Sequence, residues 1–255
     1  MGALAGDIIG SIYEFKNIKT KEFPLFTGYS IYTDDSIMTL AVSNKLLKNS
    51  TYVYETQYFG GPYANTSYDI NFRNWLFSDN PKPYNSYGNG TAMRVSPMAF
   101  AFDSIEDVLE EAKRSAEITH NHPEGIKGAQ AVASAIFLAR IGSTKDEIRK
   151  YIVDNFNYDL NRNTKEIKPI YLIDETCQGS VPEAIICFLE SNEFEDAIRL
   201  AVSIGGDSDT IACITGSIAE AFYKGVPNNI KKEVLKCLPD VLLAVLINFP
   251  DRFNM

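Results

Sequence analysis

Two short acidic motifs have the residue types and the spacing to bind metal ions. The first is TDDS at residues 33–36, which stands directly before a segment of helical character at residues 37–47. Because successive side chains at a helix start diverge by about 100°, we expect Asp34 and Asp35 to serve two neighbouring ions rather than share one. The alternative is a simple helix cap, since the helix dipole favours acidic side chains near the N-terminus.

The second motif is GGDSDT at residues 205–210, which also leads into an apolar helix. The two glycines let the backbone turn sharply, and Asp207, Asp209 and Thr210 then offer oxygen ligands. A cap would need only one of these side chains, and buried carboxylates repel one another unless a cation pairs them. Because the donors in both motifs are oxygens, the sequence favours Mg²⁺ or Mn²⁺, and less so Ca²⁺, over zinc.

A third motif, SYGNGTAMR at residues 86–94, has the composition of a phosphate-binding loop. Gly88 and Gly90 around Asn89 would expose several backbone N–H groups at a helix start, and such a nest binds phosphate. The alternative is a hairpin turn at Asn89-Gly90, although no alternating strand pattern flanks it.

The two histidines, His120 and His122, lie together in THNHP at residues 119–123. A His-x-His zinc pair lacks the cysteine or third histidine that would support it. The remaining interpretations are a surface segment that ends a helix and a histidine that hydrogen-bonds a ligand.

The segments that must position these motifs show helical patterns. The predicted helices are residues 104–118 with Ser104 as N-cap, residues 127–141, a helix after the capping-box pair Thr144 and Glu147, a helix with Pro182 in its first turn, residues 194–202, residues 210–224, and two final helices separated by Pro239. Gly2, Gly6 and Gly10 fall four apart and share one helical face, which indicates close packing against a helix or a ligand.

Strand signals are few, so we predict one all-α domain that spans residues 1–255. Residues 167–173 could form a short strand, which Pro169 weakens. Residues 50–91 are rich in Tyr, Asn, Gly and Pro, and we predict a long ordered surface region with one helix around Phe72 to Leu76. The lack of alternating strands and helices argues against Rossmann and barrel architectures.

Composition narrows the classes of partner. The net charge of −9, from 24 Lys and Arg against 33 Asp and Glu, disfavours non-specific nucleic-acid binding. The four cysteines contain no CxxC pair, and the N-terminus lacks a signal-peptide pattern. No apolar run approaches the roughly 20 residues of a membrane span. We therefore expect a cytoplasmic protein without a membrane partner, and the sequence gives no indication of its oligomeric state.

Other acid-motif classes fit the residues less well. A phosphohydrolase of the haloacid dehalogenase type would need a buried strand before Asp207, where an amphipathic helix is expected. A prenyl-chain synthase would need a third aspartate where Met38 stands, and an EF-hand would need an oxygen ligand where Ile211 stands.

Five motifs in chain order resemble the ADP-ribosylglycohydrolases, the family that includes the dinitrogenase reductase-activating glycohydrolase and the ADP-ribosyl-acceptor hydrolases. The motifs are GxxxGDxxGxxxE from Gly2 to Glu14, TDDS at Thr33, YGNGxAMR at Tyr87, THxxP at Thr119 and GGDSDT at Gly205. They cover nearly the whole chain.

The resemblance implies a compact, single-domain orthogonal multi-helix bundle with a binuclear metal site at helix N-termini. The metal ligands it implies, for two Mg²⁺ or Mn²⁺ ions, are Thr33, Asp34, Asp35, Asp207, Asp209 and Thr210. It places Glu14 on a mobile loop near the metals and His120 near the distal ribose. The substrate-binding loop it implies consists of Ser86, Tyr87, Gly88, Asn89 and Gly90, with Tyr87 stacking on or lining the ligand.

The function that the resemblance implies is metal-dependent hydrolysis of the glycosidic bond between ADP-ribose and an acceptor. The acceptor is a protein side chain, a nucleobase or a small molecule, so nucleic acid enters only as a substrate that carries ADP-ribose. The catalytic base is expected among Glu14, Asp35 and Asp207. The alternatives are a non-catalytic, metal-dependent ADP-ribose binder and a metal-dependent phosphohydrolase.

Overall fold

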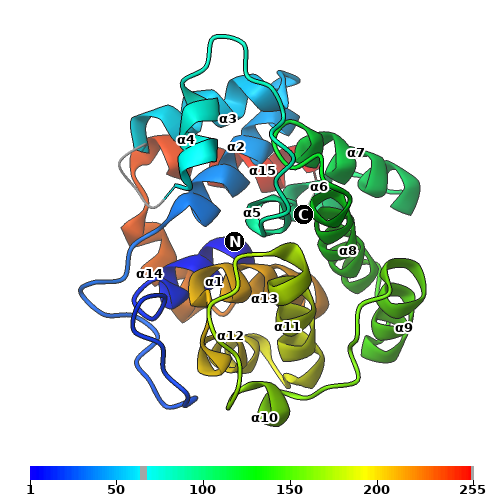
Figure 1. The fold of residues 1–255 in the computed structure, drawn as a ribbon. Coiled ribbons are helices and arrows are strands. Elements are labelled where there is room, and N and C mark those ends of the chain that lie inside the picture. The colour runs from blue at the N-terminus through cyan, green and yellow to red at the C-terminus, as the bar shows by residue number, and fades with distance from the viewer. Residues whose placement is uncertain (64–67, 254–255) are drawn as a thin grey trace.

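Helix α1 (Gly2–Gly10) packs along helix α13 (Ser208–Phe222) at the centre of the computed structural model, where Figure 1 shows them side by side. The contact is close because α1 turns its glycine face to α13. A methyl group on Gly6 would overlap the carbonyl group of Ala212, and one on Gly10 would lie 2.5 Å from the Cα of Asp209. The packing predicted from the glycine spacing is confirmed, and it brings the end of α1 to the first turn of α13.

The structure describes residues 1–63 and 68–253, and the regular elements within these ranges are helical. The other elements are α2 (Asp34–Lys48), α3 (Tyr52–Gly60), η1 (Gly61–Tyr63), α4 (Ile70–Leu76), α5 (Gly90–Met93), α6 (Ser96–Ala101), α7 (Ile105–Glu117), α8 (Pro123–Arg140), α9 (Lys145–Phe156), α10 (Thr164–Ile167), α11 (Cys177–Glu190), α12 (Phe194–Ile204), α14 (Asn228–Cys237) and α15 (Asp240–Phe253). The predicted all-α bundle is confirmed. None of these described helices has the length and apolar character needed to cross a bilayer.

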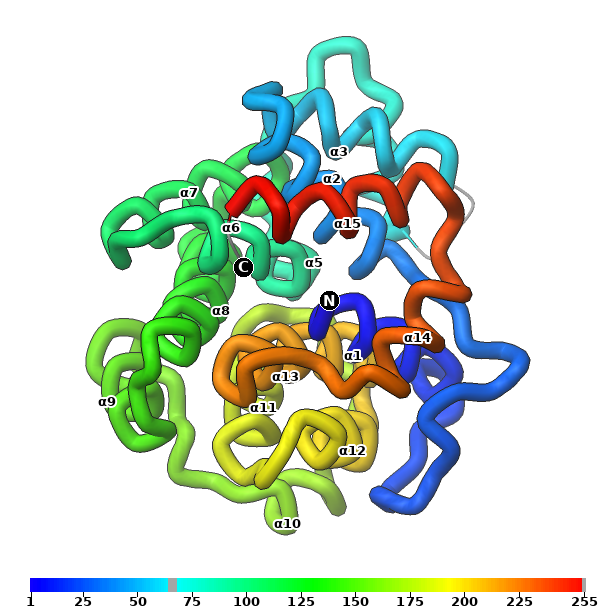
Figure 2. The backbone as a smooth tube through the Cα atoms, turned by 180° about the vertical axis from the view of Figure 1, so that it is seen from behind, coloured from blue at the N-terminus to red at the C-terminus, as the bar shows by residue number. Residues whose placement is uncertain are grey.

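Helix packing brings several helix ends to one place. Helices α8, α11 and α12 contact α13, and α2 contacts α1, so the starts of α2 and α13 lie beside the end of α1. The short helix α5 contacts α2, α8 and α13, and it is held between them. Figure 2 shows α15 crossing the outer side of α2, which closes the bundle at the back. Four short motifs that are far apart in the chain are thereby brought together.

Two segments differ from the sequence-based prediction. The expected strand at residues 167–173 is absent from the described structure: α10 ends at Ile167, and an irregular segment follows to Asp174. Pro169 cannot donate to a strand ladder, and the Tyr171 carbonyl accepts instead from the Lys19 ammonium at 2.9 Å. Helix α11 begins at Cys177, with Thr176 as its cap, so Pro182 lies inside the helix rather than in its first turn.

The surface region at residues 50–91 contains more helix than predicted. The expected helix near Phe72 is observed as α4, but α3 precedes it and was not predicted. The buried face of α3 includes the polar residues Glu55 and Thr56, while Tyr54 and Tyr58 stack on the exposed face, so no clear apolar stripe marks it. Thr51 caps it by accepting from the Tyr54 N–H at 3.1 Å. Residues 64–67, within the same predicted region, lie outside the described residues.

Candidate active site

One pocket collects most of the residues that the sequence analysis selected. It lies where the end of α1 meets the starts of α2, α5 and α13. The predicted site residues that line it are Glu14, Asp34, Asp35, Ser86, Gly88, Asn89, Gly90, His120, Asp207, Asp209 and Thr210. Thr33 and Tyr87 are the two predicted residues outside this lining set.

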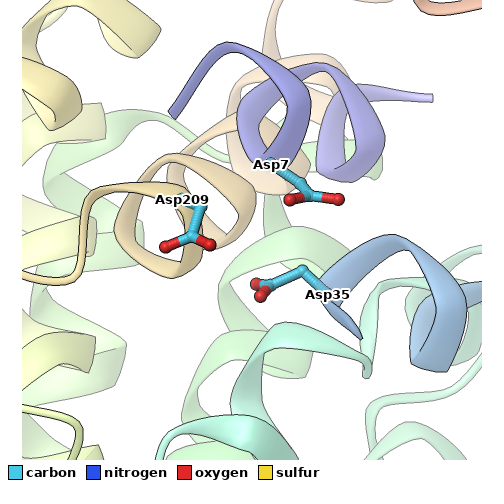
Figure 3. A group of neighbouring side chains, drawn as sticks. All are labelled: Asp7, Asp35 and Asp209. Atoms are coloured by element: carbon cyan, nitrogen blue, oxygen red, sulfur yellow. The ribbon is translucent and has the colours of Figure 1, made fainter. Parts of the chain in front are cut away.

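Carboxylates from three helices meet in the pocket. Figure 3 shows Asp7 of α1, Asp35 of α2 and Asp209 of α13 directed toward one another, and one oxygen from each lies within 4.8 Å of the others. Glu14, Asp207 and Asp209 form a second group with the same spacing. The two groups share Asp209, so these residues could hold two neighbouring cations.

Helix capping explains these acids only in part. The side chain that caps α2 is Thr33, whose hydroxyl accepts from the Asp35 N–H at 3.3 Å. A side-chain cap is therefore present at Thr33 of the first motif, and Asp34 and Asp35 lie in the first turn of α2, where the helix dipole favours them. Asp207 makes no capping hydrogen bond at the start of α13.

Asp7 differs from the other carboxylates because its oxygens are already occupied. It accepts from the N–H and the hydroxyl of Thr33 at 3.0 and 2.7 Å, from the N–H of Ser36 at 3.1 Å, and from the Ser36 hydroxyl. These four donors match the roughly four lone-pair sites of a carboxylate. Asp7 therefore positions the start of α2, and with it Asp35, rather than presenting a free oxygen to a ligand.

Asp35 has a carboxylate oxygen without a partner. Its Oδ2 accepts from the Thr210 hydroxyl at 3.2 Å, whereas its Oδ1 is buried and has no hydrogen bond to any described residue. A buried, unpaired carboxylate oxygen is costly unless a proton or a cation compensates it. The surrounding carboxylate and hydroxyl oxygens form the donor set that Mg²⁺ and Mn²⁺ prefer. The residues present therefore fit a divalent cation.

Burial and mutual repulsion raise the pKa values of this acid group. Burial raises the pKa of Asp209 well above its usual range, and repulsion from Asp207 and Asp35 adds to the effect. Burial, followed by repulsion from Asp207 and Asp34, raises the pKa of Glu14 to about 7. Burial also raises the pKa of Asp34 to about 7. A nearby cation would counter these shifts, because it favours the ionised form of each carboxyl.

The glycine loop at residues 86–90 is tied to the acid group. The side-chain amide of Asn89 donates to the Asp207 carboxylate at 2.6 Å, and this bond is buried. The backbone N–H of Asn89 donates to the Glu175 carbonyl at 2.8 Å, so the segment before α11 braces the loop. Asn89 and Gly90 begin α5 rather than a hairpin, which excludes the alternative considered for this motif.

The loop has fewer free backbone donors than its glycine pattern suggests. The N–H of Gly88 donates to the Ser86 hydroxyl at 3.2 Å, and that of Asn89 is used as described above. The N–H groups of Gly90 and Thr91, at the start of α5, donate to no described residue. These two donors remain for an anionic ligand.

His120 lies against the glycine loop. A Cβ atom placed on Gly88 would lie 3.6 Å from its Nε2, and its Nδ1 shares a 2.7 Å hydrogen bond with the Thr119 hydroxyl. Burial, with the charge of Arg94, lowers the pKa of His120 well below its usual value, so the ring is neutral. His122 instead caps α8 through its Nδ1, so the two histidines do not act as a pair.

The two predicted residues outside the lining set have other contacts. The Thr33 hydroxyl donates to Asp7, which places it behind the carboxylates. The Tyr87 ring is 47% exposed and packs 5.2 Å from the His122 ring. A contact between Tyr87 and a ligand stays a prediction.

The structure adds residues that the sequence analysis did not select. They are Asp7 in the acid group and, in the pocket lining, Tyr68, Asp69, Phe72, Tyr84, Met93, Arg94 and Glu175. Asp7 and Arg94 stand inside the motifs GDxxG and YGNGxAMR, so their motif positions are a usable signal. Asp69 and Glu175 stand in no motif, and only the fold brings them to the pocket.

A second cavity lies toward the opposite ends of the same helices. It measures about 860 Å³, against about 200 Å³ for the acidic pocket. Leu4 of α1, Leu40 of α2 and Ala221 of α13 line it, together with Phe100 and Phe249. Neither of the acid groups found among the described residues lies there. The acidic pocket is therefore the candidate site because it contains the carboxylate groups, although the second cavity is larger.

The helical bundle, the shared acid groups and the glycine loop together define an all-α protein with a candidate metal site beside a candidate anion-binding loop. The family profile described as ADP-ribosylglycohydrolase matches residues 1–253. The chain therefore belongs to the ADP-ribosylglycohydrolase family, and it is a hydrolase.

Named relatives agree with this assignment. The chain is 28% identical to human ADP-ribosylhydrolase ARH3 over 306 positions, which cover 87% of the chain and 83% of ARH3. It is 25% identical to ADP-ribosylarginine hydrolase Tri1 of Pseudomonas putida over 273 positions, which cover 89% of the chain and 70% of Tri1. Since the ARH3 alignment is longer than this 255-residue chain, ARH3 carries insertions relative to it.

A solved structure shares the fold. It is titled ADP-ribosylglycohydrolase-related protein complex and matches with a TM-score of 0.72 at 22% identity, over 100% of this chain and 95% of that one. At this identity the likeness supports the fold alone.

Proposed function

We propose that the chain is a divalent-metal-dependent hydrolase that cleaves the glycosidic bond between ADP-ribose and an acceptor. The observation that carries the proposal is the pair of carboxylate groups that share Asp209, with the buried Oδ1 of Asp35 lacking a partner. Two Mg²⁺ or Mn²⁺ ions are the cations that this oxygen donor set favours.

The residues that would hold the ions are those at the starts of α2 and α13. Asp34, Asp35, Asp207, Asp209 and Thr210 all line the pocket with oxygen donors. When bound, such ions supply Lewis acidity, which lowers the pKa of a water and orients ribose hydroxyls. Thr33 stands one position before Asp34, and its hydroxyl would have to leave its bond to Asp7 in order to complete the ligand set.

Glu14 is the proposed general base. It follows α1, is partly buried and lies with Asp207 and Asp209 in one carboxylate group. A base whose pKa is near the working pH accepts a proton efficiently. Burial is the largest cause that raises the pKa of Glu14, and it opposes the lowering that bound cations would bring. In the reaction Glu14 would take a proton from the attacking water, while Asn89 holds Asp207 in place.

The glycine loop would bind the ADP-ribosyl group. The free N–H groups of Gly90 and Thr91 support a diphosphate subsite at the start of α5. His120, neutral and close to Gly88, would offer a hydrogen bond to a ribose or phosphate oxygen without adding charge.

For the acceptor, we propose arginine as the first candidate. Asp69 and Glu175 line the pocket but belong to neither carboxylate group, so they add negative charge beside the candidate metal site. Asp69 also caps α4 by accepting from the Asn71 N–H. Two carboxylates would repel an anionic acceptor, whereas a guanidinium would pair with them. The name of the relative Tri1, ADP-ribosylarginine hydrolase, agrees with this choice. The free state of all four cysteines supports a reducing, cytoplasmic location.

A turnover assay tests the proposal. Release of ADP-ribose is measured from arginine-, serine- and nucleobase-linked substrates, with Mg²⁺ and with a chelator. We expect release that needs the metal and that Asp209→Ala abolishes without loss of the fold. Asp146→Ala, which changes an exposed aspartate on α9, is the matched control and should retain full activity. Metal-dependent ADP-ribose binding without turnover of any linkage would favour the non-catalytic alternative.

A further inference from the structure

A buried arginine without a counter-charge stands in the wall of the pocket. Arg94 follows α5, is 1% exposed and lines the pocket. Its guanidinium forms no ion pair with any residue in the ranges 1–63 and 68–253. A buried cation usually needs a carboxylate or another anion, because desolvation is costly. Burial lowers the pKa of Arg94 to about 10, so the side chain remains charged at neutral pH.

The hydrogen bonds of Arg94 leave part of its guanidinium unused. Its Nη2 donates to the Ser115 carbonyl at 3.3 Å and to the Thr119 hydroxyl at 2.9 Å. Its Nε is buried and has no partner among the described residues, and Nη1 donates to none of them. A guanidinium carries five N–H donors. The hydrogen bonds to the end of α7 therefore use only Nη2 of Arg94. Nε and Nη1 are left for a ligand.

Arg94 stands beside the backbone donors of the glycine loop. Helix α5 begins at Gly90 and ends at Met93, so Arg94 follows the free N–H groups of Gly90 and Thr91 by about one helical turn, or roughly 6 Å. Its charge also acts on His120, whose pKa it lowers. The cation, the two N–H donors and the neutral histidine thus belong to one part of the pocket.

A second role for Arg94 would be to offset the charge of the acid group. Arg94 attracts the Asp34 carboxylate electrostatically, but the two side chains are too far apart to form an ion pair in the described structure. A counter-ion for the acids would be expected in direct contact with at least one of them. The geometry favours an anion that arrives from the pocket.

We propose that Arg94 binds the diphosphate of the ADP-ribosyl substrate and thereby selects it over an uncharged ribosyl compound. This inference rests on the proposed function and adds a specificity residue to it. Arginine suits this task because its planar fork of N–H groups matches phosphate oxygens in pairs.

The test is calorimetric titration of ADP-ribose, with Mg²⁺ present, into the unchanged chain, Arg94→Met and Arg94→Lys. Arg140→Met is the matched control, because Arg140 is also partly buried and donates to the backbone carbonyls of Phe100 and Phe102, but it lies at the second cavity. A parallel Mn²⁺ titration of each protein reports on the acid group. Thermal unfolding confirms that each variant is folded at the temperature of titration.

We expect Arg94→Met to weaken ADP-ribose binding about 10- to 100-fold, the effect of losing hydrogen bonds to a charged group. Mn²⁺ affinity should stay unchanged, and Arg140→Met should bind ADP-ribose like the unchanged chain. Arg94→Lys, which keeps the charge but loses the fork, should fall between the two. If Arg94→Met does not fold, weaker ADP-ribose binding by Arg94→Lys with unchanged Mn²⁺ affinity supports the inference.

Two results would overturn the inference alone. One is ADP-ribose binding that both Arg94 variants leave intact. The other is a change in Mn²⁺ affinity as large as the change in ADP-ribose affinity: a gain would make Arg94 a counter-ion of the acids, since its removal frees them for the metal, and a loss would make it a structural support of the acid group. Failure of the unchanged chain to bind ADP-ribose would overturn the proposed function, and this inference with it.

Discussion

Removal of divalent cations should make the stability of the protein depend on pH in a direction that the acid group determines. Burial raises the pKa of Asp7 from 3.8 to about 6 and that of Asp34 from 3.8 to about 7. A carboxyl group whose folded-state pKa is raised binds its proton more tightly in the folded protein. Its stabilising contribution is therefore complete below pH 4 and is lost as the pH rises through 6 to 7.

The size of the effect follows from these two groups. One pKa unit corresponds to about 1.4 kcal/mol, so Asp7 alone gives about 3 kcal/mol and Asp34 alone about 4 kcal/mol. Because neighbouring carboxyls titrate together, we expect about 3–4 kcal/mol for the group rather than the sum. For a chain of this size, that corresponds to a change in Tm of about 6–16 °C.

The assay is thermal unfolding between pH 5 and pH 8, with a chelator and with saturating Mg²⁺. In chelator, Tm should fall as the pH rises, and Mg²⁺ should restore it more at pH 8 than at pH 5. Asp35→Asn removes one of the repelling carboxylates, so in chelator at pH 8 it should unfold at a higher temperature than the unchanged chain. The reasoning is refuted if Tm in chelator stays level or rises over this range, or if Asp35→Asn responds fully to Mg²⁺.

Three further predictions concern packing and chemistry. Gly6→Ala should destabilise the fold by about 1–3 kcal/mol, because the new methyl group overlaps the Ala212 carbonyl. Gly61→Ala is the control and should leave the stability unchanged, because its methyl group meets open space. Calorimetric unfolding of the two variants measures the difference. Asn89→Ala should lower kcat about 10-fold by releasing the buried carboxylate it holds, and an unchanged kcat would remove that bond from the mechanism. Glu14→Gln should lower kcat at least about 100-fold while calorimetry shows unchanged ADP-ribose affinity; retained turnover would exclude Glu14 as the base.

Local signals in the sequence predicted much of the fold. Thr144 and Glu147 form the predicted capping box at the start of α9, and Ser104 caps α7 as predicted. Such caps depend on residues within one helical turn, so the sequence alone is sufficient. The predicted start of α11 was wrong by one turn or more. Pro182 suits a first turn, but the helix begins earlier at its Thr176 cap and carries Pro182 in its interior, where the proline cannot donate a backbone hydrogen bond.

The site was predictable where a motif carries the chemistry and unpredictable where only the fold does. Asp34 and Asp209 stand in acidic motifs at helix starts, and both line the pocket. Asp7 escaped notice because its role depends on the end of α1 meeting Thr33, 26 residues away. Glu175 carries no local signal, since its place depends on the bond between its carbonyl and the Asn89 N–H.

The most direct test of the central claim is anomalous diffraction at the manganese edge from crystals soaked in Mn²⁺. The claim is that Asp209 contributes to two neighbouring ion sites, with Asp34, Asp35, Asp207 and Thr210 as the other ligands. We predict two peaks, each about 2.0–2.3 Å from an oxygen of Asp209, as expected for oxygen-bound divalent ions. The absence of peaks, or a single peak away from Asp209, would contradict the account of this pocket as a two-metal glycohydrolase site.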